Sequence, residues 1–138
     1  MVRKGVRSER SLLDFLWKNG VAALRVAGSG STGHPSSDII AGYHGRIVVI
    51  EVKSTRKEAV YLDNTRVTSL RALAEKIGGE AWIAVKFLPR RKFFFIRLED
   101  LEPAGRGWKI SRGLVDRKGV DQSSFVHILL GRVSQIEV

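Results

Sequence analysis

The chain has 138 residues, of which 43% are hydrophobic, enough for one domain with a real core and too few for two. It has no cysteine, which excludes disulfide bonds and thiolate metal sites. Lysine and arginine outnumber aspartate and glutamate by 24 to 14, and the net charge of +10 predicts a polyanionic partner, most simply nucleic acid. No apolar run approaches the length that spans a membrane, so we expect an intracellular, cytoplasmic and nucleoid-associated protein with no membrane partner.

Hydrophobic patterns along the chain predict helices and strands in a definite order. The expected helices are residues 8–19, a second that begins at Asp63 or Asn64 and ends at 77, and a third at 123–131 that is capped by serine. The expected strands are residues 21–27, 37–42, 47–53, 81–88 and 93–98, with a short extended piece at 60–62 and a weak strand at 108–110. The order predicts a single α/β domain with an αβββαβ core, in which a mixed central β-sheet is flanked by helices.

The first expected helix contains an acidic residue that has more than one interpretation. Ser8 is the expected N-cap and Gly20 the expected stop. Glu9 lies in the first turn, where a negative charge suits the helix dipole. Three leucines follow Glu9 at helical spacing, so Glu9 shares the apolar stripe, and we expect it to point toward the core or its rim.

A segment rich in glycine and serine follows the first expected strand. Residues 28–37 lack the spacing of a dinucleotide-binding or P-loop fingerprint, and they have the composition of a mobile loop. The loop runs directly into Asp38. We therefore interpret it as a flexible flap over an active site.

The most informative stretch is residues 47–53, whose β-branched aliphatic residues predict a strand buried in the middle of a sheet. Glu51 and Lys53 end this strand, and they point to the same face because side chains alternate along a strand. The preceding strand begins near Asp38, and residues 43–46 between the two strands can form a turn. Antiparallel pairing would place Asp38 near Glu51, at the same end of the hairpin.

Glu9, Asp38 and Glu51 are therefore candidates to meet at one end of the sheet, with Lys53 beside them. Carboxylates about 5 Å apart repel one another by roughly 3 kcal/mol per pair, so they either take up protons or bind a cation. Hard oxygen ligands suit Mg²⁺, with Mn²⁺ as a substitute, and the three histidines show no ligand spacing. A cation held by carboxylates beside a basic surface predicts hydrolysis of phosphodiester bonds.

These residues resemble the PD-(D/E)-X-K nuclease superfamily, because Asp38 is followed, after twelve intervening residues, by a Glu-Val-Lys motif. Further motifs resemble those of one branch, the archaeal Holliday junction resolvases. They are Arg3-Lys4-Gly5, Glu9-Arg10, Arg25 with Ala27-Gly28-Ser29, and residues 38–42, 50–53, 78–79, 84–87 and 129–131. The residue before Asp38 is Ser37 and not the proline of the superfamily name, but that proline is not a ligand.

The resemblance implies a homodimer that recognises four-way DNA junctions by shape and nicks two opposed strands with Mg²⁺ in homologous recombination and repair. Asp38 and Glu51 would bind the metal. Glu9 would be a further ligand or would support the bound water, and Lys53 would act on the nucleophile or the phosphate. The implied DNA-binding residues are Arg10 and Arg25 near the site, together with Lys4, Arg56 and Lys57.

Two further regions carry expectations of their own. Ser29 or Ser31 of the loop would approach the cut strand, according to the same resemblance. The helix at 123–131 is apolar around most of its circumference. That pattern favours either a dimer interface formed by Phe125, Ile128 and Leu129 or ordinary docking of the helix on the sheet.

Two other functions fit the residues. Another nuclease of the same superfamily would act on ordinary duplex or damaged DNA. A non-catalytic basic DNA-binding module would use Glu51 and Lys53 only as a buried ion pair. Metal-dependent cleavage separates the module from the enzymes, and preference for a four-way junction over a linear duplex separates the two nucleases.

Overall fold

A six-stranded mixed sheet runs through the middle of the computed structural model, which describes residues 4–28 and 33–132. Its strands, in spatial order, are β1 (Ala22–Arg25), β2 (Ile39–Tyr43), β3 (Arg46–Thr55), β5 (Glu80–Phe87), β6 (Phe94–Arg97) and β9 (Val120–Asp121). Neighbouring strands are antiparallel except β3 and β5, which run parallel. A parallel pair needs a long crossover, and here the crossover contains α2 (Asn64–Ile77). The expected mixed sheet with flanking helices is confirmed.

A second, three-stranded sheet lies beside the first. Its spatial order is β4 (Ala59–Leu62), β8 (Gly107–Ser111) and β7 (Glu102–Ala104), and the single-turn helix η1 (Leu98–Asp100) lies just before β7 in the chain. Val60 pairs with Ile110, so the short extended piece and the weak strand expected from the sequence are partners. Short strands of this kind carry little signal of their own, because pairing and burial stabilise them.

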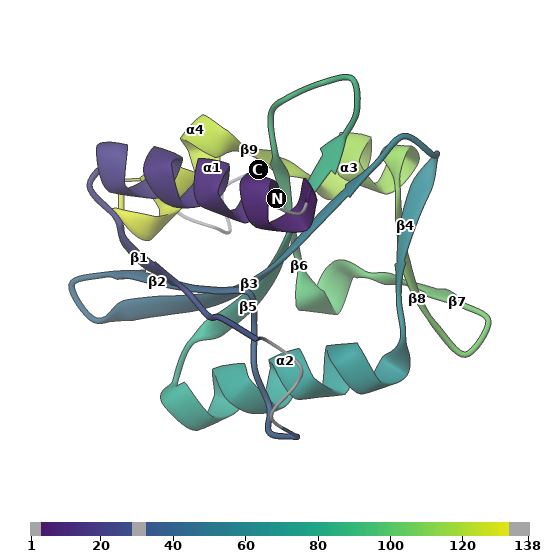
Figure 1. The fold of residues 1–138 in the computed structure, drawn as a ribbon, viewed down its shortest axis with the longest axis horizontal. Helices are drawn as coiled ribbons and strands as arrows, with labels where there is room; N and C mark the ends of the chain where they lie inside the picture. The colour runs from purple at the N-terminus through teal and green to yellow at the C-terminus, as the bar shows by residue number, and fades with distance from the viewer. Residues whose placement is uncertain (1–3, 29–32, 133–138) are drawn as a thin grey trace.

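Helices cover both faces of the six-stranded sheet (Figure 1). On one face lie α1 (Lys4–Lys18) and α4 (Gln122–Leu129), with a core that includes Leu16, Ile50 and Trp82. The other face is covered by α2 and the small sheet, with a core that includes Val49 and Leu70. Val49 and Ile50 therefore belong to opposite cores, as expected for a strand that is buried on both faces.

The hairpin of β2 and β3 sets the register on which the site depends. Tyr43 pairs with Arg46, and the two residues between them, His44 and Gly45, have φ angles of 48° and 85°. Two positive φ angles in a two-residue loop are typical of the type I′ turn that matches the twist of paired strands. The turn expected at residues 43–46 is thus confirmed.

Several helix boundaries differ from the sequence-based expectations. The first helix begins at Lys4, so Ser8 is not its N-cap but a buried residue inside the helix. The last helix begins at Gln122, and its cap is Asp121, which accepts a hydrogen bond from the N–H of Ser124. A serine is a weak boundary signal, because it is tolerated within helices and any nearby oxygen can satisfy the same N–H groups.

Besides the short elements η1 and β7, two further elements between residues 99 and 122 were not predicted. The helix α3 (Arg112–Lys118) has seven residues and contains Gly113, which lowers its intrinsic helix propensity. Its cap is Ser111, which accepts from the N–H of Leu114 at 3.0 Å. The strand β9 has only two residues, and it exists because it pairs with the first two residues of β6. Neither element is long enough to show a hydrophobic period.

The helix α4 docks on the sheet of its own chain. Phe125, Ile128 and Leu129, the residues expected to form a dimer interface if the helix did not simply dock, are 0%, 6% and 2% exposed and belong to the core. The ring of Phe125 stacks on Phe95, with centroids 3.9 Å apart. Docking therefore accounts for the apolar circumference of the helix, and a dimer that used α4 would contact its exposed side chains.

We expect Phe125→Ala to lower the free energy of unfolding by about 3–5 kcal/mol, because truncation removes a buried aromatic side chain and leaves a cavity between α4 and the sheet. Urea denaturation followed by circular dichroism measures this change. The control is Leu24→Ala on the edge strand β1, where the side chain is 70% exposed and the expected change is within about 0.5 kcal/mol. Similar losses for both variants would contradict the core position of Phe125.

Candidate active site and basic surface

Asp38 lies where β1, β2 and β3 meet. Its N–H donates to the carbonyl of Ile50 at 3.1 Å, and its carbonyl accepts from the N–H of Val26 at 2.8 Å. Its side-chain oxygen Oδ2 accepts from the N–H of Val52 at 2.9 Å. Ile39 is paired with Ile50, so Asp38 stands beside Glu51, one step further along the hairpin.

Glu51 points to the face of the sheet that α2 covers. Val49, two residues before it, packs in the core beneath α2, and side chains alternate along β3. Lys53 follows on the same face. Glu51 is only 6% exposed, and this burial raises its pKa to about 7; Asp38 adds to the increase by repulsion, whereas Arg66 and Lys53 oppose it. The hairpin thus gathers two carboxylates and a lysine on one side of the sheet, as the sequence predicts.

The closest partner of Glu51 is a residue for which the sequence suggested no role. Arg66 of α2 forms an ion pair with Glu51, with Nη2 2.5 Å from Oε1. One signal was present, because Arg66 lies in the first turn after the cap Asp63, where a cation opposes the helix dipole.

Glu9 forms a separate pair on the other face of the sheet. Nε of Arg25 lies 2.7 Å from Oε1 of Glu9, and Arg25 shares the strand face of Ala23, which packs in the core with α1. Burial raises the pKa of Glu9, with a contribution from the charge of Asp38, while the hydrogen bond from Arg25 lowers it. Asp38 at the sheet end therefore interacts with both glutamates.

The three expected carboxylates do not form one ligand cluster. Among residues 4–28 and 33–132, no three acidic or histidine side chains lie close enough together to hold a metal ion. The physical reason is that Glu9 approaches from the α1 face and Glu51 from the α2 face. Asp38 and Glu51 therefore lie together in this structure, with Glu9 on the opposite face of the sheet, and the assignment of Glu9 to the metal site stays a prediction.

The remaining expected DNA contacts lie at or near the surface. Arg10, Arg56 and Lys57 are exposed. The side chain of Lys4 and the serines Ser29 and Ser31 lie outside the described part of the chain.

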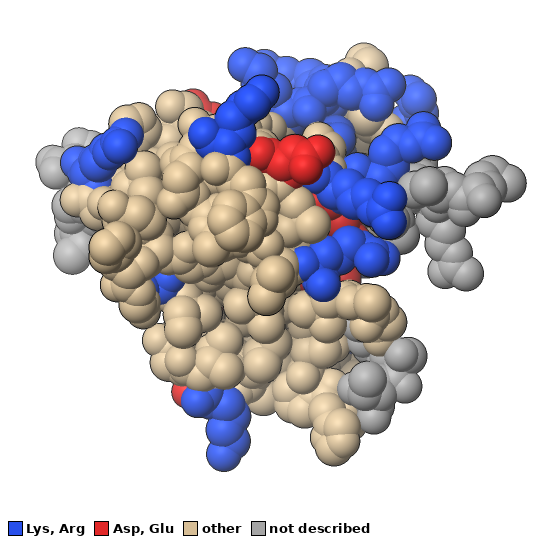
Figure 2. Space-filling view, turned by 60° about the vertical axis from the view of Figure 1, so that its left-hand side comes forward, with Lys and Arg blue, Asp and Glu red and all other residues tan. Residues whose placement is uncertain are grey.

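The basic residues are not spread evenly. Figure 2 shows many of the Lys and Arg side chains gathered on one side around a small acidic area, while a broad neighbouring region carries neither sign of charge. Clustered cations of this kind attract a polyanion. Within the described residues, no helix is long and apolar enough to cross a membrane.

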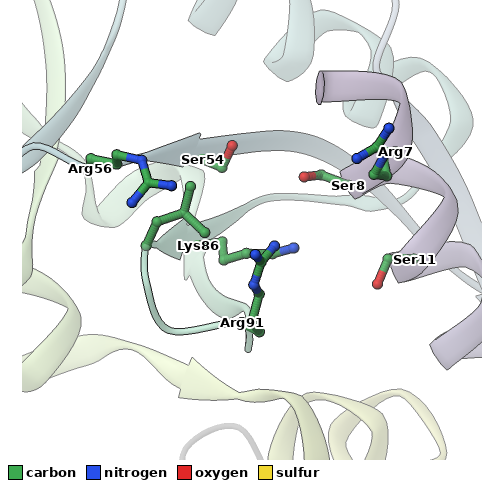
Figure 3. Close-up of a pocket in the computed structure, with 8 residues that line it drawn as sticks. Arg7, Ser8, Ser11, Ser54, Arg56, Lys86 and Arg91 are labelled. Atoms are coloured by element: carbon green, nitrogen blue, oxygen red, sulfur yellow. The ribbon is translucent and has the colours of Figure 1, made fainter. Parts of the chain in front are cut away.

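A cavity of about 550 Å³, which we call the basic pocket, opens between α1 and the ends of β3 and β5 (Figure 3). Among the described residues, its lining combines four cationic side chains with three hydroxyl groups and one leucine, and it includes no carboxylate. The residues are Arg7, Ser8, Ser11, Ser54, Arg56, Lys86, Leu88 and Arg91. Cations and hydroxyls without an acidic partner are suited to phosphate oxygens.

Lys86 is a buried cation of the basic pocket. It is 6% exposed, and its ammonium lies 4.6 Å from the ring centre of Phe93. Burial lowers its pKa, and the charge of Arg91 lowers it further. Sequence reasoning assigned no binding role to Lys86, Arg7 or Arg91. The available signal was a lysine inside an otherwise apolar strand, since a buried charge is costly unless something uses it.

The raised pKa of Glu51 predicts a pH dependence of stability. Below the ordinary pKa of 4.5 the carboxyl is protonated in both states. As the pH rises toward 7, the unfolded chain releases this proton while the folded chain retains it, so the folded state loses stability. Relative to Glu51→Gln, we expect the free energy of unfolding of wild type to fall by about 3 kcal/mol across this pH range. Above the range, the difference between the two proteins should stay constant.

Urea unfolding of both proteins in EDTA, between about pH 4 and pH 8, measures the difference. The matched control is Asp116→Asn, an exposed acid on α3, whose difference from wild type should vary little with pH. A difference between wild type and Glu51→Gln that is constant across the range would contradict the raised pKa.

The pair Asp38 and Glu51 fits a hard divalent cation. Both supply carboxylate oxygens, which Mg²⁺ and Mn²⁺ prefer. Repulsion from Asp38 contributes to the raised pKa of Glu51, and a cation would relieve that repulsion. The chain has no cysteine, so thiolate ligands play no part.

The fold and the site together define a class of protein. An α/β core that brings an aspartate and a Glu-X-Lys motif to one face of a central hairpin is the arrangement of PD-(D/E)-X-K nucleases. Comparison with known families is more specific. A family profile described as archaeal Holliday junction resolvase (Hjc) matches residues 1–132, and the chain belongs to this family.

Individual relatives agree. A crossover junction endodeoxyribonuclease Hjc from Archaeoglobus fulgidus is 42% identical over 114 residues, which are 83% of each chain. One from Sulfolobus acidocaldarius is 28% identical over 134 residues, covering 96% of this chain and 92% of the relative. The solved structure of Archaeoglobus fulgidus Hjc, described as a Holliday junction resolvase, superposes with a TM-score of 0.82 and 36% identity, over 88% of this chain and 99% of that one.

Proposed function

We propose that this protein is a structure-selective endonuclease that resolves four-way DNA junctions by metal-dependent nicking of two opposed strands. One observation carries the proposal: in a member of this family, Asp38 is held by the N–H of Val52, next to Glu51 and on the face that Lys53 shares. A buried ion pair between Glu51 and Lys53 would leave no role for Asp38.

Each side chain has a role that its position supports. A divalent cation at such carboxylates lowers the pKa of a bound water and stabilises the charge that develops on the phosphate. Asp38 and Glu51 would hold the cation, and the backbone fixes the orientation of Asp38. Lys53 would orient the attacking water or offset charge on the phosphate. Glu9 keeps Arg25 in place, at 2.7 Å, where its guanidinium can meet a neighbouring phosphate.

The basic pocket would hold the DNA backbone beside the site. Ser54 of the pocket directly follows Lys53 on β3, and Lys86 on the neighbouring strand β5 pairs with Ser54. The acidic pair and the pocket therefore open near the same end of the sheet, on opposite faces. A strand that curves around this end could meet both, which suits a substrate recognised by its shape.

Two opposed nicks require two sites, and we propose that two copies of the chain supply them as a symmetric homodimer. Sedimentation analysis of the protein, alone and with DNA, tests this assignment. A protein that stays monomeric on a bound junction would contradict it.

The central test compares cleavage of two substrates of matched sequence, a synthetic four-way junction and a linear duplex, across a titration of Mg²⁺. We expect paired nicks in the junction and little cleavage of the duplex. Equal cleavage of both would assign the protein to another nuclease function. Binding without cleavage at any Mg²⁺ or Mn²⁺ concentration would assign it to a non-catalytic module.

Junction affinity should fall steeply with salt, because each lysine or arginine that neutralises a phosphate releases counterions. We expect Arg91→Gln in the basic pocket to reduce the slope of log affinity against log salt by about 1, with a similar loss for junctions of different sequence. Fluorescence anisotropy over a salt series measures the slope. The control Arg106→Gln, at the exposed turn between β7 and β8, should leave it unchanged. Equal slopes for all three proteins would remove the basic pocket from the DNA-binding surface.

A further inference from the structure

Arg66 occupies a position on α2 that normally favours an acidic side chain. Asp63 caps the helix and accepts a hydrogen bond from the N–H of Arg66 at 2.7 Å. Arg66 is thus the third residue of the first turn, where a glutamate or glutamine completes a capping box and where the helix dipole disfavours a cation. Local helix energetics do not explain an arginine at this position, so the explanation must lie in its contacts outside the helix.

The guanidinium of Arg66 makes two hydrogen bonds to a single oxygen of Glu51. Nε and Nη2 donate to Oε1 at 2.9 and 2.5 Å, and the two side chains are 18% and 8% exposed. Nη1 lies 3.4 Å from Oγ of Ser36, two residues before Asp38. The guanidinium of Arg66 is therefore bound to the carboxylate of Glu51, which the proposed function assigns as a metal ligand.

A guanidinium and a divalent cation next to the same carboxylate oppose each other. Their repulsion is strong where side chains are buried, because little water screens them. Hydrogen bonds from arginine to a carboxylate are among the stronger ones in proteins, and the two bonds here would have to lengthen or break. Cation binding at Glu51 is therefore coupled to the position of Arg66.

The fold leaves room for Arg66 to move. A cavity of about 440 Å³ lies between α2 and residues 33–35, and Arg66 lines it together with Asp63. This cavity offers the guanidinium a position away from Glu51 and on the side of the Asp63 carboxylate.

We propose that Arg66 competes with the divalent cation for Glu51 and thereby sets the cation concentration at which the site fills. The inference rests on the proposed function, because it takes Glu51 as a metal ligand. It adds a residue that regulates the site from outside the ligand set. Arg66 acts through Glu51, so it is a positioning residue.

The test is calorimetric titration of the full chain with MnCl₂, in the absence of DNA, for wild type, Arg66→Gln and Arg71→Gln. Arg71 is an exposed arginine on the same helix, so the control matches the change in charge. The titration is run at about pH 8.5, so that protonation of Glu51 does not compete. We expect the Kd of Arg66→Gln for Mn²⁺ to be at least about tenfold lower than that of wild type, equivalent to about 1.4 kcal/mol, and that of Arg71→Gln to be unchanged.

An unchanged or higher Kd in folded Arg66→Gln would overturn the inference, since it would make Arg66 neutral toward the cation or supportive of it. Thermal unfolding in EDTA establishes that each variant is folded. If Arg66→Gln does not fold, Arg66→Lys replaces it, because a lysine keeps the charge but cannot form the two-donor fork. We then expect a Kd lower by about threefold, and an unchanged value would overturn the inference equally.

Glu51→Gln separates failure of this inference from failure of the proposed function. If wild type binds Mn²⁺, Glu51→Gln does not, and Arg66→Gln matches wild type, only the competition is wrong. If Mn²⁺ binding is absent from wild type and from Arg66→Gln, or survives in Glu51→Gln, then Glu51 is not a ligand. The proposed metal site and the inference then fail together.

Discussion

Asp38→Asn and Glu51→Gln should each reduce cleavage of a four-way junction by at least about a thousandfold. Each substitution removes one carboxylate charge and leaves the size of the side chain unchanged. With one charge gone, the remaining carboxylate is expected to hold a cation poorly, and the charge that develops on the phosphate loses its main stabilisation. Single-turnover nicking of a labelled junction in Mg²⁺ measures the rate.

Junction affinity should survive in both variants, because the phosphate contacts proposed above come from basic side chains that neither substitution touches. Affinity is measured by anisotropy in Ca²⁺ or EDTA. The control is again Asp116→Asn, which should cleave as wild type does. Cleavage at the wild-type rate by Asp38→Asn or Glu51→Gln would show that the site lies elsewhere.

Lys53→Met should slow cleavage by about a hundredfold or more. The substitution removes the ammonium group that lies on the same face of the sheet as Glu51, where negative charge develops on the phosphate during the reaction. The charge of Lys53 lowers the pKa of Glu51, so the two groups are within electrostatic reach. Single-turnover rates at saturating protein separate this effect from binding. We expect Lys53→Arg to recover part of the rate by restoring the charge.

Lys57→Met is the matched control, since Lys57 is an exposed lysine only four residues further along the chain. It should weaken junction binding at most modestly and leave the saturated rate within about threefold of wild type. If the two substitutions slowed cleavage equally, Lys53 would have no role in cleavage beyond that of any other basic residue near the DNA.

The elements that carry a strong local pattern were predictable. The run of β-branched residues was enough to predict the central strand. A glycine between two apolar strands was enough to predict the hairpin. The helix α3 and the strand β9 were missed because seven and two residues carry no readable period. The start of α1 was misplaced by four residues, because Ser8 offered a plausible cap inside a helix that continues through it.

The candidate site was predictable in part for the same reason. Asp38, Glu51 and Lys53 lie on adjacent strands of one hairpin, so their proximity follows from alternation and a short turn. Glu9 comes from another layer, and the side from which it approaches depends on how α1 packs. The sequence therefore could not show that Glu9 lies on the opposite face of the sheet from Glu51, although Glu9 and Asp38 do interact.

The sequence by itself determined the acidic and basic residues of the hairpin, their common face and the excess of positive charge, because these follow from backbone alternation and composition. Tertiary structure alone decided which arginine meets which glutamate: Arg25 meets Glu9 and Arg66 meets Glu51, across 16 and 15 residues of chain. It also assembled the basic pocket from α1, β3 and β5. Such contacts depend on the packing of separate layers, and no local pattern encodes the distance between them.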